Sequence, residues 1–501
     1  MERYRFRKTS LLVATALLTS SCASIHQAGQ DYGTAIGCVG GAALGGGLTY
    51  LITGDAKKAL AGGLVGGIAG CAVGNIWQNR EKALAQVAAE EHIAISTRPL
   101  EAAANSNKQT VGLVAQVEDK GMFDTNSAQL SASGLRQVQK IAAAMKQGDQ
   151  GGVILVVGHT DATGSAEWNQ RLSEQRAQNV GRVLERAGLS AKNLYFQGAG
   201  SSRPLADNTS DAGRAANRRV EITGLASEAL LKQRLEQEGN NLAYLRYGAT
   251  IQQPAAASSS RTTSASASAR PQAKSKSRVS TSSSSSTSSP SATAAASAPD
   301  ARSSDTSGNA AIVDFGGQRV NAGVQSVAAN LKPLSNKGGL ISSANASGAA
   351  MSCLADSARV SGQAKNLASG KAVETHETRE YFTGMNGRAW AGLVNGHLVT
   401  LSPVKVLRDD ATVTENPRVF ITRDYQSKGN RKADAPISAR ANAWEGENDI
   451  LYRVYLQNEK QQAISCIDLL VPKEKTKAQQ GQLFYNNHSQ AWMAGYTPQR
   501  G

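Results

Sequence analysis

A long run of serine and alanine, residues 249–310, constrains the fold of this chain more than any other feature. The run includes "SSSSSTSSPSATAAASAP" and offers too few large apolar side chains to bury a core, so we expect it to be disordered. The chain has 501 residues, which exceeds what one hydrophobic core usually holds. The sequence therefore predicts folded regions on both sides of a linker.

The N-terminus has the layout of a secretory signal. Several basic residues precede the apolar run 11–18, which is too short to cross a bilayer. The following "LTSSC" resembles a bacterial lipoprotein box, although Thr19 stands where Leu is usual. The resemblance implies a signal peptide over residues 1–21, acylation of Cys22, for instance with palmitate, and outer-membrane sorting because Ala23 follows. Ordinary cleavage that leaves a soluble secreted chain is the alternative.

Glycines at every fourth position mark residues 22–80 as a helical hairpin. Two uncharged stretches, 34–52 and 59–77, flank a turn at Gly54-Asp55. Within each stretch the spacing puts the glycines on one helical face, where two backbones can approach closely. The glycines are Gly37, Gly41 and Gly45, then Gly62, Gly66, Gly70 and Gly74. This pattern resembles the glycine-zipper segments of bacterial envelope proteins.

The same hairpin predicts a disulfide. Cys38 and Cys71 lie equally far from the turn, so the equal rise of two antiparallel helices brings them to one level. Hydropathy leaves two placements of the hairpin open. It either crosses a membrane or lies against a membrane or protein surface.

Strand and helix patterns alternate between residues 111 and 222. "TVGLVAQVEDKGMFD" predicts one or two short strands, and a helix with Ser131 as N-cap follows. "GGVILVVGH" is a continuous apolar run, typical of a central strand buried on both faces. A long amphipathic helix, the strand "NLYFQGAG" and the strand "NRRVEIT" complete a βαβαβ unit.

Four motifs in this region occur in the order of a known family. "FDTNSAQLSASG", "GHTDATGSAEWNQRLSEQRAQNV", "GAGSSRP" and "GRAANRRVEI" resemble the successive signatures of the OmpA-like peptidoglycan-binding domain. The resemblance implies an α+β fold, an OmpA-like βαβαβ sandwich, for a domain over residues 90–224. A polar helical pattern then predicts a helical extension over residues 225–248. The resemblance also implies that Asp161 and Arg176 hold the diaminopimelate of the cell-wall stem peptide.

The chemistry of that pair is reasonable without the resemblance. Diaminopimelate presents an ammonium and a carboxylate, so one acid and one base fixed across a cleft satisfy both, and the planar fork of Arg grips a carboxylate with two parallel bonds. Further peptidoglycan contacts implied by the resemblance are Asn169, Asp124, Thr160, and Arg218 or Arg219. Taken alone, an Asp before a helix is more often a cap and a helical Arg more often a surface ion-pair partner.

A second, mostly β domain is expected over residues 311–501. "AWAGLV" and "HLVTLS" flank Asn395-Gly396, which is a strong hairpin signal, and four more strand patterns follow. A helical lead-in is expected around residues 320–331. Cys353 and Cys466 are candidates for a disulfide, although free buried thiols are the alternative. We recognise no family resemblance in this half.

The favoured function is a non-catalytic outer-membrane lipoprotein at the periplasmic face that anchors the envelope to peptidoglycan. No cofactor is expected, and His159 beside Asp161 lacks further ligands at metal-binding spacing. The net charge of +15 favours anionic neighbours, but we expect no nucleic-acid partner.

Two alternatives stay open. One is a peptidoglycan-anchored component of an envelope-spanning secretion system, with an envelope protein as the partner of residues 311–501. The other is a cell-wall hydrolase with its activity in the C-terminal domain, although that region contains no recognisable catalytic motif.

Overall fold

The computed structural model describes ten stretches of the chain, residues 76–104, 107–148, 151–248, 313–321, 325–334, 350–375, 380–408, 410–457, 463–488 and 490–501. The expected glycine hairpin, Cys22, the Cys38–Cys71 pair and the linker 249–310 lie outside these residues. All described residues belong to one compact unit. Among them, no helix has the length and apolar character that a membrane crossing needs.

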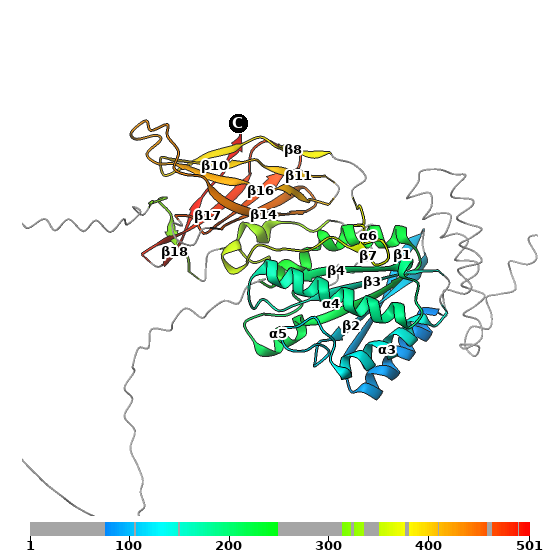
Figure 1. Cartoon of the computed structure of the whole chain (residues 1–501). Helices are drawn as coiled ribbons and strands as arrows, with labels where there is room; N and C mark the ends of the chain where they lie inside the picture. Colours follow the sequence, from blue (N-terminus) through cyan, green and yellow to red (C-terminus); the bar gives the residue numbers. More distant parts are fainter. Residues whose placement is uncertain are drawn as a thin grey trace, which may run out of the picture. The chain divides into compact units, whose positions relative to one another are not determined.

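A mixed sheet forms the centre of the first folded region (Figure 1). Its strand order is β1-β2-β5-β3-β4-β7, and only the β3–β4 pair is parallel. At its middle, Val156 of β3 pairs with Phe196 of β4 and with Ile222 of β5. The strands are β1 (Ile95–Ala104), β2 (Asn107–Glu118), β3 (Val153–His159), β4 (Leu194–Gly200), β5 (Arg219–Leu225) and β7 (Lys365–Asn366).

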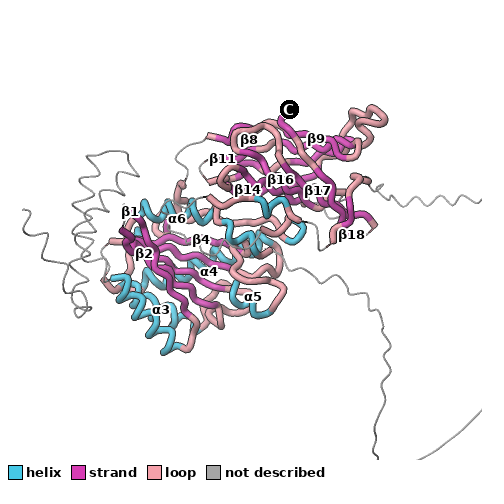
Figure 2. Tube along the Cα trace, turned by 180° about the vertical axis from the view of Figure 1, so that it is seen from behind, coloured by secondary structure: helices cyan, strands magenta, loops and turns pink. Residues whose placement is uncertain are grey.

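Helices cover both faces of this sheet. Apolar side chains of α3, α4 and the helix 76–91 pack on one face, and those of α6 pack on the other. Figure 2 shows α3 and α6 on opposite sides of the strands. Every residue of β3 is buried, as expected for a central strand. Ser131 caps α3 as predicted, since its Oγ accepts the Gly134 N–H at 2.9 Å. The helices are α3 (Ala132–Lys146), α4 (Ala166–Arg186), η1 (Ala191–Asn193), α5 (Asp211–Asn217), α6 (Glu228–Gly239) and η2 (Leu242–Arg246).

Glycines let α4 lie unusually close to the sheet. A Cβ atom on Gly158 would stand 2.2 Å from the Ser173 carbonyl oxygen, and one on Gly198 would stand 2.5 Å from the Gln170 carbonyl oxygen. The Ser173 hydroxyl also accepts the Gly200 N–H at 2.8 Å. These contacts fix the distance of α4 from β3 and β4.

We expect Gly158→Ala to lower the free energy of unfolding by about 1–3 kcal/mol, because the new methyl meets backbone that cannot yield cheaply. Thermal unfolding of the full chain measures the loss. The matched control is Gly239→Ala, where an added Cβ has no atom within 4 Å. Equal stability of both variants would show that α4 is not packed this closely.

The C-terminal region is mostly β, as expected. Its ten-stranded sheet has the order β19-β9-β10-β13-β14-β15-β16-β17-β18-β6, and a three-stranded sheet has the order β12-β11-β8, both among the described residues. The strands are β6 (Gln318–Arg319), β8 (Tyr381–Asn386), β9 (Trp390–Val394), β10 (His397–Ser402), β11 (Lys405–Leu407), β12 (Val413–Glu415), β13 (Arg418–Thr422), β14 (Ile437–Glu445), β15 (Asp449–Leu456), β16 (Cys466–Pro472), β17 (Gln480–Asn487), β18 (Gln490–Gly495) and β19 (Gln499–Arg500).

Two sequence expectations for this region have different outcomes. The hairpin is present, because Asn395 and Gly396 join β9 to β10 with φ values of 45° and 79°, the left-handed backbone that a tight primed turn requires. The helical lead-in over residues 320–331 is wrong. In its described residues the only helical element is the 3₁₀ turn η3 (Val327–Asn330), which is flanked by extended backbone at Ser326 and Leu331. Ala328 and Leu331 pack in a small core with Trp444.

A disulfide and a buried charge cluster tie the segment after the linker to the large sheet. Cys353, in the turn η5 (Cys353–Ala355), is bonded to Cys466 of β16, with Cα atoms 6.1 Å apart. Beside it, Arg453 of β15 lies opposite Asp468 of β16, and Asp356 approaches from the other side. The three side chains have no solvent exposure.

Residues beyond the linker also complete the first sheet. β7 pairs with the free edge of β4, and Lys365 forms an ion pair with Glu174 of α4 at 2.5 Å. Arg359 donates to the Ser202 carbonyl oxygen at 2.7 Å and to the Tyr247 carbonyl oxygen at 2.8 Å. The sheet of the first region therefore includes a strand that follows residue 310 in sequence.

Candidate functional site

Asp161 lies in the short turn between β3 and α4. Its Oδ1 accepts the Thr163 N–H at 2.9 Å, which fixes the carboxylate within the turn. The N-cap of α4 is Ser165, whose hydroxyl accepts the Trp168 N–H at 3.3 Å. Asp161 is therefore not the capping residue of this helix, and its second oxygen is available for another role.

That second oxygen pairs with Arg218, which follows α5 and precedes β5. Arg218 Nη1 stands 2.7 Å from Asp161 Oδ2, with the Arg218 side chain 40% exposed and that of Asp161 13% exposed. Burial raises the pKa of Asp161, but hydrogen bonds from Arg218 and Thr163 outweigh it and bring the pKa below its ordinary value. Asp161 is thus a carboxylate at neutral pH.

Arg176, on α4, pairs with a residue that the sequence motifs did not single out. Its Nη1 is 2.8 Å from Asp119 Oδ2, its Nε donates to the Ser127 carbonyl oxygen at 2.9 Å, and its guanidinium lies 4.6 Å from the centre of the Phe123 ring. Both charged side chains are nearly buried, at 8% and 7% exposure. No direct ion pair joins Arg176 to Asp161 among the described residues.

The pKa of Asp119 shows the effect of this burial. Desolvation raises it above the ordinary value, and the nearby charges of Arg176 and Arg218 oppose that rise. Arg218 therefore influences both acids, and its backbone carbonyl also accepts the Asp119 N–H at 2.9 Å. The two acids and two bases form one electrostatic cluster, which we call the four-charge cluster: Asp119, Asp161, Arg176 and Arg218.

Two other predicted residues, Asn169 and Thr160, are buried beside the turn that carries Asp161. The Asn169 side chain is buried and donates to the carbonyl oxygens of Asp161 and Thr163, at 3.3 and 2.9 Å. Thr160 is buried, and its N–H donates to the Gly200 carbonyl oxygen at 3.0 Å. Both residues hold the turn that carries Asp161.

The remaining two predicted residues differ from each other in exposure. Arg219 is buried and donates to the carbonyl oxygens of Asn217 and Arg203, so it points away from Asp161. Of the adjacent pair, it is Arg218 that reaches the carboxylate. Asp124 is exposed, in the loop after β2.

Sequence reasoning missed Asp119, the last acid of "VEDKG". The available signal was its position: it directly follows β2, four residues before Phe123, whose ring supports Arg176. An acidic side chain at the end of β2 can therefore reach a basic side chain of α4 that packs against Phe123. Nothing in the linear motif, however, specifies the separation between β2 and α4.

The four-charge cluster has matched positive and negative charge with one partly exposed member. Such an arrangement is suited to a ligand that carries both an ammonium and a carboxylate, because each ligand charge finds an oppositely charged group nearby. A metal is not suggested, since the described residues contain no cluster of His, Cys, Asp and Glu arranged to hold one. His159 is buried, with Nε2 3.9 Å from Glu221 Oε2, and desolvation places its pKa well below the ordinary value.

The sequence containing most of this cluster has known relatives. Residues 122–218 match the OmpA family. Residues 1–78 match the YMGG-like Gly-zipper family, so the expected glycine zipper is confirmed as a sequence feature. The OmpA-like region thus includes Asp161, Arg176 and Arg218, whereas Asp119 lies just before its matched residues.

Individual relatives match about a fifth of the chain. The chain is 37% identical over 111 residues to the probable lipoprotein YiaD of Escherichia coli K12, which covers 22% of this chain and 50% of the relative. It is 42% identical over 106 residues to the outer-membrane lipoprotein YfiB of Pseudomonas aeruginosa, covering 21% and 62%. The chain thus spans about half to three fifths of these curated relatives. A solved cell wall anchor of the T6SS from P. aeruginosa is 28% identical, covering 29% of this chain and 95% of that chain with a TM-score of 0.24.

Proposed function

We propose that the OmpA-like region binds peptidoglycan through the diaminopimelate of its stem peptide. The observation that carries the proposal is the four-charge cluster, in which Asp161 and Arg176 are held by separate partners instead of by each other. Asp161 receives the ligand ammonium, and Arg176 receives the carboxylate. The OmpA resemblance supports the same two roles.

The contacts explain why both positions suit this task. Among the described residues Arg176 uses Nε and Nη1 for Ser127 and Asp119, which leaves Nη2 for a ligand carboxylate. Arg218 is the more exposed base, so it can release Asp161 to an incoming ammonium and turn to the carboxylate. Each charge-assisted bond contributes about 1.5–3 kcal/mol, and a repeating polymer multiplies such contacts.

The proposed setting is the outer membrane. The lipoprotein-box resemblance at Cys22 and the two lipoprotein relatives support a lipid anchor at the periplasmic face, and the match over residues 1–78 supports a glycine-zipper segment beside it. We propose that the chain is non-catalytic and that it links this membrane to the cell wall. Residues 311–501 would meet a further envelope partner.

Arg218 provides a test that separates ligand contact from burial. We expect Arg218→Ala to weaken sedimentation of the detergent-purified full chain with peptidoglycan sacculi by about tenfold, which corresponds to one charge-assisted bond. Arg171→Ala is the matched control, because Arg171 is an exposed arginine of α4 outside the four-charge cluster. If both variants bind like the unmodified chain, Arg218 has no part in the site.

A further inference from the structure

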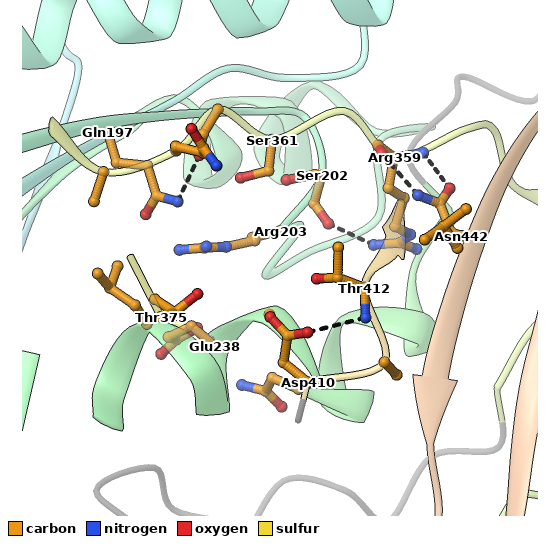
Figure 3. Close-up of a pocket in the computed structure, with 18 of the residues that line it drawn as sticks. Gln197, Ser202, Arg203, Glu238, Arg359, Ser361, Thr375, Asp410, Thr412 and Asn442 are labelled. Carbon is orange, nitrogen blue, oxygen red and sulfur yellow. Dashed lines mark hydrogen bonds between the residues drawn. The ribbon is translucent and has the colours of Figure 1, made fainter. Parts of the chain in front are cut away.

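A polar cavity lies apart from the four-charge cluster. Its volume is about 380 Å³, within the range of small-ligand pockets. The walls come from the end of β4 with the turn that follows it, from α6, from residues 359–364 and from residues 410–413 and 441–444 (Figure 3). Neither Asp161 nor Arg176 lines it.

Arg203 is the unusual member of this cavity. Its side chain extends across the space in Figure 3, and the residue is only 8% exposed. Its guanidinium makes no hydrogen bond or ion pair with any residue in the described stretches. Arg359 on the same wall has the partners that a buried arginine usually has. It pairs with Asp356 at 3.0 Å and donates to two backbone carbonyls.

The Arg203 guanidinium carries a full charge and has no protein acceptor among the described residues, so its N–H groups are available to an anion in the cavity. Glu238 does not satisfy it. That carboxylate is within 3.2 Å of Arg234 and accepts the Tyr244 hydroxyl at 2.5 Å, although Arg203 acts on it from a greater distance. A structural role for Arg203 is therefore poorly supported by its contacts.

Other polar groups of the cavity also lack hydrogen-bond partners among the described residues. Gln197 Nε2 donates to the Gly362 carbonyl oxygen at 2.7 Å, but its buried Oε1 has no partner in the described ranges. Within the described part of the chain, the hydroxyls of Ser361 and Thr375 on opposite sides of Arg203 make no hydrogen bond (Figure 3). Trp444 and Leu235 add apolar surface to the wall.

We propose that this cavity binds a carboxylated sugar, with Arg203 holding the carboxylate. The guanidinium fork matches a carboxylate with two parallel bonds. The hydroxyls of Ser361 and Thr375 bond to sugar hydroxyls, and the apolar wall covers the C–H face of the ring. The many polar groups and the modest volume exclude a long apolar ligand.

Calorimetric titration of the detergent-purified full chain with glucuronate, glucose and inorganic phosphate tests the proposal. Glucuronate is expected to bind at least tenfold more tightly than glucose, which lacks the carboxylate, and than phosphate, which lacks the hydroxylated ring. Arg203→Gln should weaken glucuronate binding at least tenfold and Arg203→Lys by less. Arg388→Gln, which changes an exposed arginine of the C-terminal region, should have no effect.

A stability measurement separates ligand binding from a structural role. Without sugar, Arg203→Met should raise the melting temperature, because it removes a largely buried charge that has no ion-pair partner among the described residues. Glucuronate should raise the melting temperature of the unmodified chain but not that of Arg203→Met. A lower melting temperature for Arg203→Met, undiminished glucuronate binding by Arg203→Gln, or equal binding of phosphate would overturn the proposal. Asp161→Ala should leave glucuronate binding intact, so this site and the proposed peptidoglycan site can fail separately.

Discussion

Arg453→Leu is expected to lower the free energy of unfolding of the C-terminal region by about 3–5 kcal/mol, the usual cost of breaking a buried ion pair by removing one partner. Arg453 Nε and Nη2 donate to the two oxygens of Asp468, at 2.6 and 3.1 Å, and Nη1 donates to Asp356 at 2.9 Å. Its removal leaves the carboxylates of Asp356 and Asp468 buried from solvent and lacking the hydrogen-bond donors that Arg453 supplied. Thermal or urea unfolding of the full chain measures the effect.

Two further variants sharpen this result. Adding Asp468→Asn to Arg453→Leu should restore part of the loss, because a neutral amide does not require a counter-charge. Arg388→Leu, at an exposed arginine, should change stability by less than about 0.5 kcal/mol. A loss below about 1 kcal/mol in Arg453→Leu would contradict the complete burial of the cluster.

Removal of the Cys353–Cys466 disulfide is expected to destabilise the same region by about 4 kcal/mol. The bond closes a loop with a sequence separation of 113 residues, and long loops restrict the unfolded chain most in the chain-entropy account. The Cys353→Ala/Cys466→Ala variant, made in a Cys38→Ala/Cys71→Ala background, isolates this bond from the other cysteine pair. Its unfolding midpoint should fall below that of the background protein.

Reductant provides the internal control for this second prediction. It should lower the midpoint of the background protein to that of the four-alanine variant and leave the variant itself unchanged. A variant as stable as its background would indicate that packing of Cys353 beside Tyr455 and Phe484 holds the segment without the covalent bond.

Local patterns account for the parts of the fold that were predicted correctly. The apolar run of β3, the helical periodicity of α4 and the Asn395-Gly396 turn each encode their structure within a few neighbouring residues. β1 was missed because "ISTRPLEAAA" contains a proline and charges and shows little alternation. β7 was missed because two residues become a strand only when they reach the distant edge of β4.

The residues of the candidate site also fall into those predictable from local sequence and those that depend on the folded structure. Asp161 and Arg176 were identified because they belong to linear motifs. Their ion-pair partners depend on tertiary distances: Arg218 was one of two adjacent candidates until burial separated it from Arg219, and Asp119 had no motif at all. Arg203 is a similar case, since only the folded chain reveals a largely buried arginine whose guanidinium has no partner in the described part of the chain.

Sedimentation with peptidoglycan sacculi tests the central claim most directly. The detergent-purified full chain would be compared with Asp161→Ala, Arg176→Ala and the control Arg171→Ala, each first checked for native folding by circular dichroism. We expect the unmodified chain and Arg171→Ala to sediment with the sacculi, and both site variants to stay largely in the supernatant. Undiminished sedimentation of the two folded site variants would contradict the account and leave the basic net charge of the chain as the explanation for wall binding.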